Sequence, residues 1–200
     1  VDAMFGALAQ IVPDRVPAAG EGGNTVVCLG GYRGDGSRFI IVDMICGAWG
    51  ARPNKDGIEG VTNPSQNLSN TPVETLESQH PVRVEEYALV PNSCGAGRWR
   101  GGLGLSRSYR VLAKEAGLQL RADRMKFRPY GLQGGGEAPG SKNTLVEANG
   151  ETHLLPSKVN RQMYEGDLIH HIQPGGGGFG DPMTRDPIRV AADVWNEKIS

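Results

Sequence analysis

Alternation of hydrophobic and polar residues recurs along the chain and predicts β-strands. Such runs occupy residues 25–29, 38–46, 82–90, 105–112, 118–122 and 167–173. In one of them, Leu118, Leu120 and Ala122 fall on one face, and Gln119 and Arg121 fall on the other. This is the spacing of a strand with one buried and one polar face.

Two Gly-containing turns connect neighbouring runs. Asn149-Gly150 lies between residues 144–148 and 151–155, and this dipeptide between two such runs predicts a β-hairpin. Asp35-Gly36 separates the runs at 25–29 and 38–46 and favours a turn with positive φ.

Helical spacing is confined to the two ends and to the region around residue 75. At the amino end, Val1, Met4, Phe5 and Leu8 follow it. At the carboxyl end, Asp186-Pro187 predicts an N-cap followed by the first helical residue. The apolar stripe of this last helix is Ile188, Ala191, Val194 and Trp195. Because both helices need a covering surface, we expect the chain to be a segment of a longer polypeptide or a processed piece that stays docked.

The middle helix begins with Thr71-Pro72-Val73-Glu74, which predicts a capping box between the threonine and the glutamate. Glu74 is then a cap. Glu77 lies three residues further on the same helical face, so the alternative is a pair of carboxylates that flank a cation or a substrate.

Many strands at short spacing with few helices predict an α+β class. We expect a β-rich fold of mainly antiparallel strands, few helices and Gly-rich loops. With 200 residues, no internal repeat and no flexible linker, we expect residues 1–200 to form a single domain.

Residues 174–182 form a glycine run, Pro-Gly-Gly-Gly-Gly-Phe-Gly-Asp-Pro. Glycine allows backbone conformations and close approaches that a side chain would prevent. The run is either a functional loop or a tight structural crossing. A phosphate-binding loop needs Gly-Lys-Ser/Thr after its glycines, but Phe179, Gly180 and Asp181 follow here. The structural interpretation is therefore favoured.

Composition excludes several classes of function. Twenty-one basic and 22 acidic residues give a net charge of −1, so a nucleic-acid partner is not indicated. No apolar stretch approaches the roughly 20 residues of a membrane span, and the first residues lack the pattern of a secretory signal. We expect a cytoplasmic protein without a membrane partner. Three widely spaced cysteines, Cys28, Cys46 and Cys94, predict buried free thiols.

The histidines predict no metal site within this chain. His170 and His171 are adjacent in a predicted strand, so one side chain should point inward and the other outward. His80 and His153 have no neighbours at a recognised ligand spacing.

Two charged segments are candidates for chemistry. Residues 92–104 combine a glycine-shaped turn with Arg98 and Arg100, which predicts either an anion-binding turn or a structural turn with solvated arginines. Residues 122–129, beside the glycine-rich stretch 130–136, form either a charged site wall or a salt-bridged surface loop. Cys94 has no adjacent base or cation in sequence that would activate it as a nucleophile.

Taken together, four motifs resemble the C-terminal part of hydantoinase B/oxoprolinase proteins. They are residues 70–77 (Asn-Thr-Pro-Val-Glu-Thr-Leu-Glu), 97–104 (Gly-Arg-Trp-Arg-Gly-Gly-Leu-Gly), Asp123-Arg124 with 129–135, and 174–182. Residues 50–52 with Asp56-Gly57 fit the same pattern. The resemblance extends over about residues 20–200.

The resemblance implies a part in the ATP-dependent opening of a cyclic amide such as a hydantoin or 5-oxoproline. It also implies an ATP-binding hydantoinase A-like subunit or domain as the partner, which would bind ATP with Mg²⁺. A divalent metal of the family would lie outside this segment. The enzymatic alternative is a subunit of an ATP-dependent ketone carboxylase, and the non-enzymatic one is a β-rich scaffold that docks a partner.

Five residues in these motifs are candidates for a substrate pocket. Asp56, Glu74 and Asp123 would position polar groups, and Arg100 and Arg124 would stabilise an anion.

Overall fold

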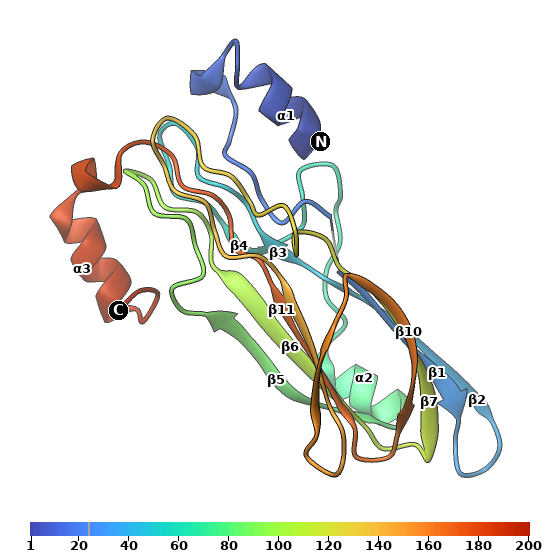
Figure 1. Ribbon diagram of the computed structural model, residues 1–200. Helices are drawn as coiled ribbons and strands as arrows, with labels where there is room; N and C mark the ends of the chain where they lie inside the picture. The colour runs from blue at the N-terminus through green and yellow to red at the C-terminus, as the bar shows by residue number, and fades with distance from the viewer. Residues whose placement is uncertain (24) are drawn as a thin grey trace.

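The computed structural model describes residues 1–23 and 25–200. Two antiparallel sheets lie together in its lower half (Figure 1). The first has the order β10-β7-β1-β2, with β1 at Thr25–Tyr32, β2 at Arg38–Ile45, β7 at Glu115–Arg121 and β10 at Lys158–Tyr164. The second has the order β5-β6-β11-β8-β9, with β5 at Val82–Val90, β6 at Gly104–Val111, β8 at Lys142–Val146, β9 at Thr152–Leu155 and β11 at Leu168–Gln173. A small third sheet pairs β3 (Gly47–Ala48) with β4 (Glu59–Val61).

A single hydrophobic core joins the two large sheets. The first sheet contributes Val27, Leu29, Phe39 and Ile41, and the second contributes Leu105, Tyr109, Leu145 and Ile169. In β2, residues alternate strictly between exposed and buried, as the sequence pattern predicts. The β-rich, antiparallel fold class is confirmed.

The three predicted helices are present. They are α1 (Asp2–Leu8), α2 (Val73–Gln79) and α3 (Pro187–Trp195), with short 3₁₀ turns at Pro13–Arg15 and Pro182–Thr184. Asp186 caps α3 as predicted, because its carboxylate accepts the Ile188 N–H at 2.9 Å. The apolar stripe of α3 is uncovered by the described residues, with Ile188 78% and Trp195 87% exposed. None of the helices described in the structure has the length and apolar character needed to cross a membrane.

The predicted capping box of α2 is wrong. The N-cap is Pro72, and no side chain bonds to the first turn of the helix. Since the helix begins one residue later than predicted, Thr71 lies outside it and Glu74 does not occupy the third helical position. Glu74 is exposed, whereas the Glu77 carboxylate accepts the N–H of Val84 at 2.7 Å and ties α2 to β5.

Both predicted turns are confirmed. Gly150 has φ 90° in the turn that joins β8 to β9, and Gly36 has φ 80° in the turn that joins β1 to β2. Glycine adopts such angles without steric cost, which explains its place in each turn.

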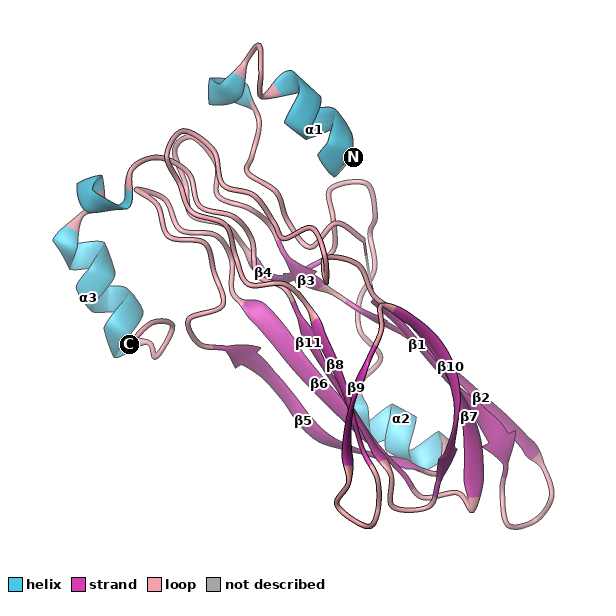
Figure 2. Ribbon diagram, viewed as in Figure 1, coloured by secondary structure: helices cyan, strands magenta, loops and turns pink. Residues whose placement is uncertain are grey.

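Above the sheets, five glycine-containing segments run side by side between the strands and the helices α1 and α3 (Figure 2). We call them the glycine bundle, residues 18–22, 48–58, 93–104, 129–138 and 174–181. The run at 174–181 is its central chain. Successive amides of this chain turn to different neighbours, at 2.8–2.9 Å. The amides of Gly176, Gly177 and Gly178 donate to Gly102, Ala19 and Gly136, and their carbonyls accept from Gly95, Ala51 and Leu132.

No side chain fits between these backbones. A Cβ atom on Gly176 would lie 2.1 Å from the carbonyl oxygen of Trp49. On Gly177 or Gly178 it would lie 2.0 Å from the Tyr130 oxygen or 1.9 Å from the Ala96 oxygen. The glycine run is thus a tight structural crossing, as predicted.

Candidate functional site

Two of the predicted site residues, Asp56 and Arg100, meet in a network of ion pairs beside α3. We call this the C-terminal ion-pair network, which also contains Glu59, Arg185 and Asp193. Arg185 binds both oxygens of Asp56, at 2.8 and 3.0 Å, and reaches Asp193 at 2.6 Å. Arg100 binds Asp193 at 2.9 Å and Glu59 at 2.7 Å.

The opposite charges of this network stabilise one another in their ionised forms. Burial alone would raise the pKa of Asp56, but the hydrogen bonds and charge of Arg185, with the Arg100 amide and charge, hold it below its usual value. Burial would likewise lower the pKa of Arg185, but Asp56 and Asp193 raise it. The network therefore fastens α3 to the glycine bundle with ionised groups. The description of Arg100 as a solvated arginine is wrong, since its side chain is only 8% exposed, whereas Arg98 is exposed.

Cys94 lines a cavity of about 320 Å³ together with Arg100, Arg185 and Asp193. Burial raises the pKa of its thiol, and the nearby Arg100 charge opposes this only in part. A thiol of raised pKa is a poor nucleophile at neutral pH. Cys46 is buried as predicted, while Cys28 and Cys94 are half-buried.

Asp123 and Arg124 lie together at a second place, against the loop at residues 20–23. Arg124 has φ 63° and forms an ion pair with Asp2 of α1. A Cβ atom on Gly22 would lie 2.8 Å from Nε of Arg124, and one on Gly23 would lie 2.9 Å from a carboxylate oxygen of Asp123. This pair adjoins the loop that carries Glu21. Glu74, exposed on α2, belongs to neither place.

The structure also contains a polar chain between the sheets that the sequence did not reveal. We call Glu21, Thr25, Asn143, His171 and Gln173 the interior polar chain. Each of these five side chains belongs to a residue with an exposed fraction of 1% or less. Gln173 donates to Glu21 at 2.7 Å and lies 2.6 Å from both Thr25 and His171. His171 in turn lies 2.6 Å from Asn143.

Burial shifts both titratable groups of this chain. It raises the pKa of Glu21 to about 8, against the lowering effect of its hydrogen bonds to Gln173 and the Asn63 amide. It lowers the pKa of His171 to about 4. Shifts of this size are typical of acid–base sites, although structural networks also produce them.

One signal in the sequence points toward this chain. His171 and Gln173 are two residues apart in β11, so both face the same side. His171 points inward and is fully buried, while the half-buried His170 lies 2.7 Å from Ser106, so the prediction of one inward and one outward histidine is confirmed.

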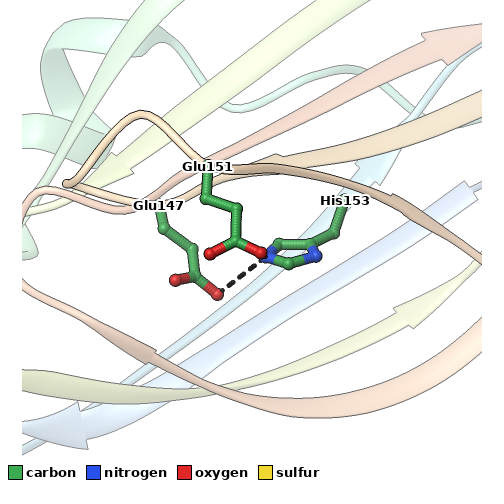
Figure 3. Close-up of side chains that lie close together, drawn as sticks. All are labelled: Glu147, Glu151 and His153. Atoms are coloured by element: carbon green, nitrogen blue, oxygen red, sulfur yellow. Dashed lines mark ion pairs between the residues drawn. The ribbon is translucent and has the colours of Figure 1, made fainter.

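A group of possible metal ligands lies at the β8–β9 hairpin (Figure 3). Glu147, Glu151 and His153 place one ligand atom each within 4.8 Å of one another. The hairpin thus supplies neighbours for His153 that the sequence spacing did not indicate. One oxygen of Glu147 also binds Arg161 at 2.7 Å and lies 3.0 Å from His153, so this ligand atom is already engaged by a cation.

Comparisons with known proteins agree with this architecture. The hydantoinase B/oxoprolinase family model matches residues 1–182, and the chain belongs to this family. The B component of a putative D-/L-hydantoinase from Pseudomonas sp. (strain NS671) is 36% identical over 96% of the chain, which covers 32% of that protein. The chain thus spans about a third of the length of this relative.

Two solved structures share the fold. The ATP-dependent caprolactamase from Pseudomonas jessenii matches with a TM-score of 0.84 and 25% identity, over 97% of this chain and 35% of that one. Acetone carboxylase in its nucleotide-free form matches with a TM-score of 0.77 and 20% identity, over 92% and 29% of the two chains.

Proposed function

We propose that this chain is part of a subunit of an ATP-dependent amidohydrolase that opens a cyclic amide such as a hydantoin or 5-oxoproline. This proposal rests on the similarity of nearly the whole length of this chain to the hydantoinase component from Pseudomonas sp.. An A-like partner subunit or domain would bind ATP with Mg²⁺, and any divalent metal would lie outside this segment. The assembly would work in the cytoplasm, where ATP is supplied.

The chemistry explains why such a reaction needs ATP. An amide carbon is a poor electrophile, and phosphorylation of the amide oxygen both activates that carbon and provides a leaving group. Anionic intermediates on this path are stabilised by preorganised cationic and hydrogen-bonding groups.

The five candidate pocket residues lie in different places, so they do not support this proposal equally. Asp56 and Arg100 serve the C-terminal ion-pair network, and Glu74 stands alone on α2. Asp123 and Arg124 lie against Gly22 and Gly23 of the loop that carries the buried Glu21. They are therefore the first pair to test for positioning of polar groups and stabilisation of an anion.

Two measurements test the proposal. Native mass spectrometry of the protein from its own source should find an ATP-binding partner bound to it. The isolated assembly should then release ADP in proportion to the cyclic amide opened. An assembly that hydrolyses no cyclic amide, or a solitary species of 21.3 kDa, would contradict it.

A ketone carboxylase subunit is the second candidate, favoured by the shared fold with acetone carboxylase. It predicts ATP consumption that requires bicarbonate and a ketone. A non-catalytic scaffold is the third, favoured by the purely structural use of the glycine bundle. It predicts that the partner retains turnover when Asp123 and Arg124 are both neutralised.

A further inference from the structure

The interior polar chain fixes the position of one proton. Asn143 directs its amide nitrogen to the Pro156 carbonyl at 3.1 Å and to the Met125 sulfur at 3.3 Å. Its oxygen therefore faces Nδ1 of His171 at 2.6 Å. Because an amide oxygen only accepts hydrogen bonds, Nδ1 must carry a proton.

The second ring nitrogen depends on Gln173, whose amide oxygen and nitrogen are nearly equal in size. If the oxygen faces Nε2 of His171, the nitrogen faces Glu21, and the hydrogen bonds require an imidazolium, while Oε2 of Glu21 accepts as a carboxylate oxygen does. If the amide is turned by 180°, its N–H faces Nε2 and its oxygen faces Glu21. The hydrogen bonds then require a neutral imidazole and a protonated carboxyl group.

We propose that Glu21 and His171 form a buried acid–base site that shares one proton, with Glu21 holding it at neutral pH and Gln173 turning as it moves. The two arrangements differ in the place of one proton, which is bound to Nε2 of His171 in one and to an oxygen of Glu21 in the other. Gln173 keeps both its amide protons, and the total charge is unchanged. Thr25 satisfies Gln173 in either orientation, since its hydroxyl group both donates and accepts.

The surroundings favour the neutral arrangement. The charge of Asp2 disfavours ionisation of Glu21, and the neighbouring His170 disfavours a charged His171, so both oppose charge separation. Arg107, which pairs with His171 across the β6–β11 ladder, is bound to Asp43 at 3.0 Å, so these two charges largely cancel. Two fully buried charges would cost more than their mutual attraction returns unless every hydrogen bond is satisfied.

The other oxygen of the Glu21 carboxyl group has no such partner in the part of the chain that the structure describes. Its Oε1 atom is buried without a hydrogen bond of normal geometry to the described residues. Glu21 also lines a cavity of about 10 Å³, together with Asp2, Phe5, Trp49 and Pro64. A space of that size admits only one small group, of the size of a water molecule.

Nuclear magnetic resonance of the purified protein, labelled with ¹³C-glutamate and ¹⁵N-histidine, tests the proposal. The Glu21 carboxyl signal, identified by its loss in Glu21→Gln, should titrate near pH 8. The His171 Nε2 signal should be that of an unprotonated nitrogen at pH 7 and should shift with the same midpoint. This shift should be lost in Glu21→Gln and kept in Glu137→Gln, which alters an exposed ion pair.

A Glu21 carboxylate that is ionised from pH 5 to 9, with His171 protonated on both nitrogens, would overturn the proposal in favour of a fixed ion pair. A His171 signal that does not shift when Glu21 ionises would also overturn the proposal. The two wild-type titrations decide between these outcomes even if Glu21→Gln does not fold. None of them depends on the reaction that the whole assembly catalyses.

Discussion

Gly101 and Gly176 lie so close together that a Cβ atom on Gly101 would be 1.8 Å from the carbonyl oxygen of Gly176. The two glycines are neighbours in the glycine bundle, where the Gly176 N–H donates to Gly102 at 2.8 Å. Backbone faces backbone here, so the packing has no flexible side chain that could yield. Gly101 and Gly176 are required by contact rather than by a positive φ angle.

We expect Gly101→Ala to destabilise the protein by about 3 kcal/mol or more, because overpacking of rigid backbone leaves no rotamer that relieves the clash. Gly34→Ala is the matched control, since no atom lies within 4 Å of its Cβ position. Urea unfolding followed by circular dichroism measures both. Equal midpoints for the two variants would contradict the close packing.

Loss of Arg185 should release α3. Arg185→Met leaves Asp56 and Asp193 without their shared partner, and breaking a buried pair typically costs about 3–5 kcal/mol. The partial exposure of Asp56 places the expected loss near the lower value. Arg128→Met removes an exposed pair with Glu137 and should cost less than about 1 kcal/mol. Thermal unfolding compares the two variants. Limited proteolysis should cut Arg185→Met near α3, and the absence of such a cut would count against the interpretation.

Stability should depend on pH through Glu21. Because its folded pKa is raised to about 8 from 4.5, the folded state holds a proton that the unfolded state releases between these values. This contribution is fully present below pH 4.5 and is lost as pH rises toward 8, by at most about 1.4 kcal/mol per pH unit. Glu21→Gln should remove that part of the slope. A difference in the free energy of unfolding between wild type and variant that stays constant from pH 5 to 8 would show that Glu21 ionises normally.

His171 should act in the opposite direction. Its pKa is lowered from 6.5 to about 4, so its contribution is present above pH 6.5 and is lost as pH falls toward 4. Between pH 4.5 and 6.5 the two groups therefore oppose each other. In Glu21→Gln only the contribution of His171 should remain. The free energy of unfolding of the variant should therefore fall more steeply on acidification through this window than that of wild type. Urea unfolding at half-unit pH steps resolves the two slopes.

Arg124 tests the proposed function directly. In the complete assembly, Arg124→Gln should lower kcat/KM by about 100-fold if its guanidinium stabilises an anionic intermediate. Arg128→Gln, four residues away and exposed, should leave turnover unchanged. Turnover and fold that are both preserved in Arg124→Gln would remove this residue from the site.

Much of the strand pattern could be predicted from the sequence because alternation reports directly on the burial of each face. β5 was predicted over its full length, and the hairpin around Gly150 followed from its dipeptide. β10 was not predicted, because Val159 and Met163 are the only aliphatic side chains of a strand that is otherwise polar, apart from Tyr164. The start of α2 was misplaced because Pro72 occupies the cap position itself.

The sequence by itself determined the class of fold, the positions of most strands and helices, and the presence of a backbone crossing that only glycine permits. Tertiary structure alone decided which backbones cross, which charges pair and which polar groups meet inside. Glu21 and Gln173 are 152 positions apart but share a hydrogen bond of 2.7 Å. The physical reason is that local patterns record whether a side chain is buried, whereas its partner is set by the pairing of distant strands and by the exclusion of water around them.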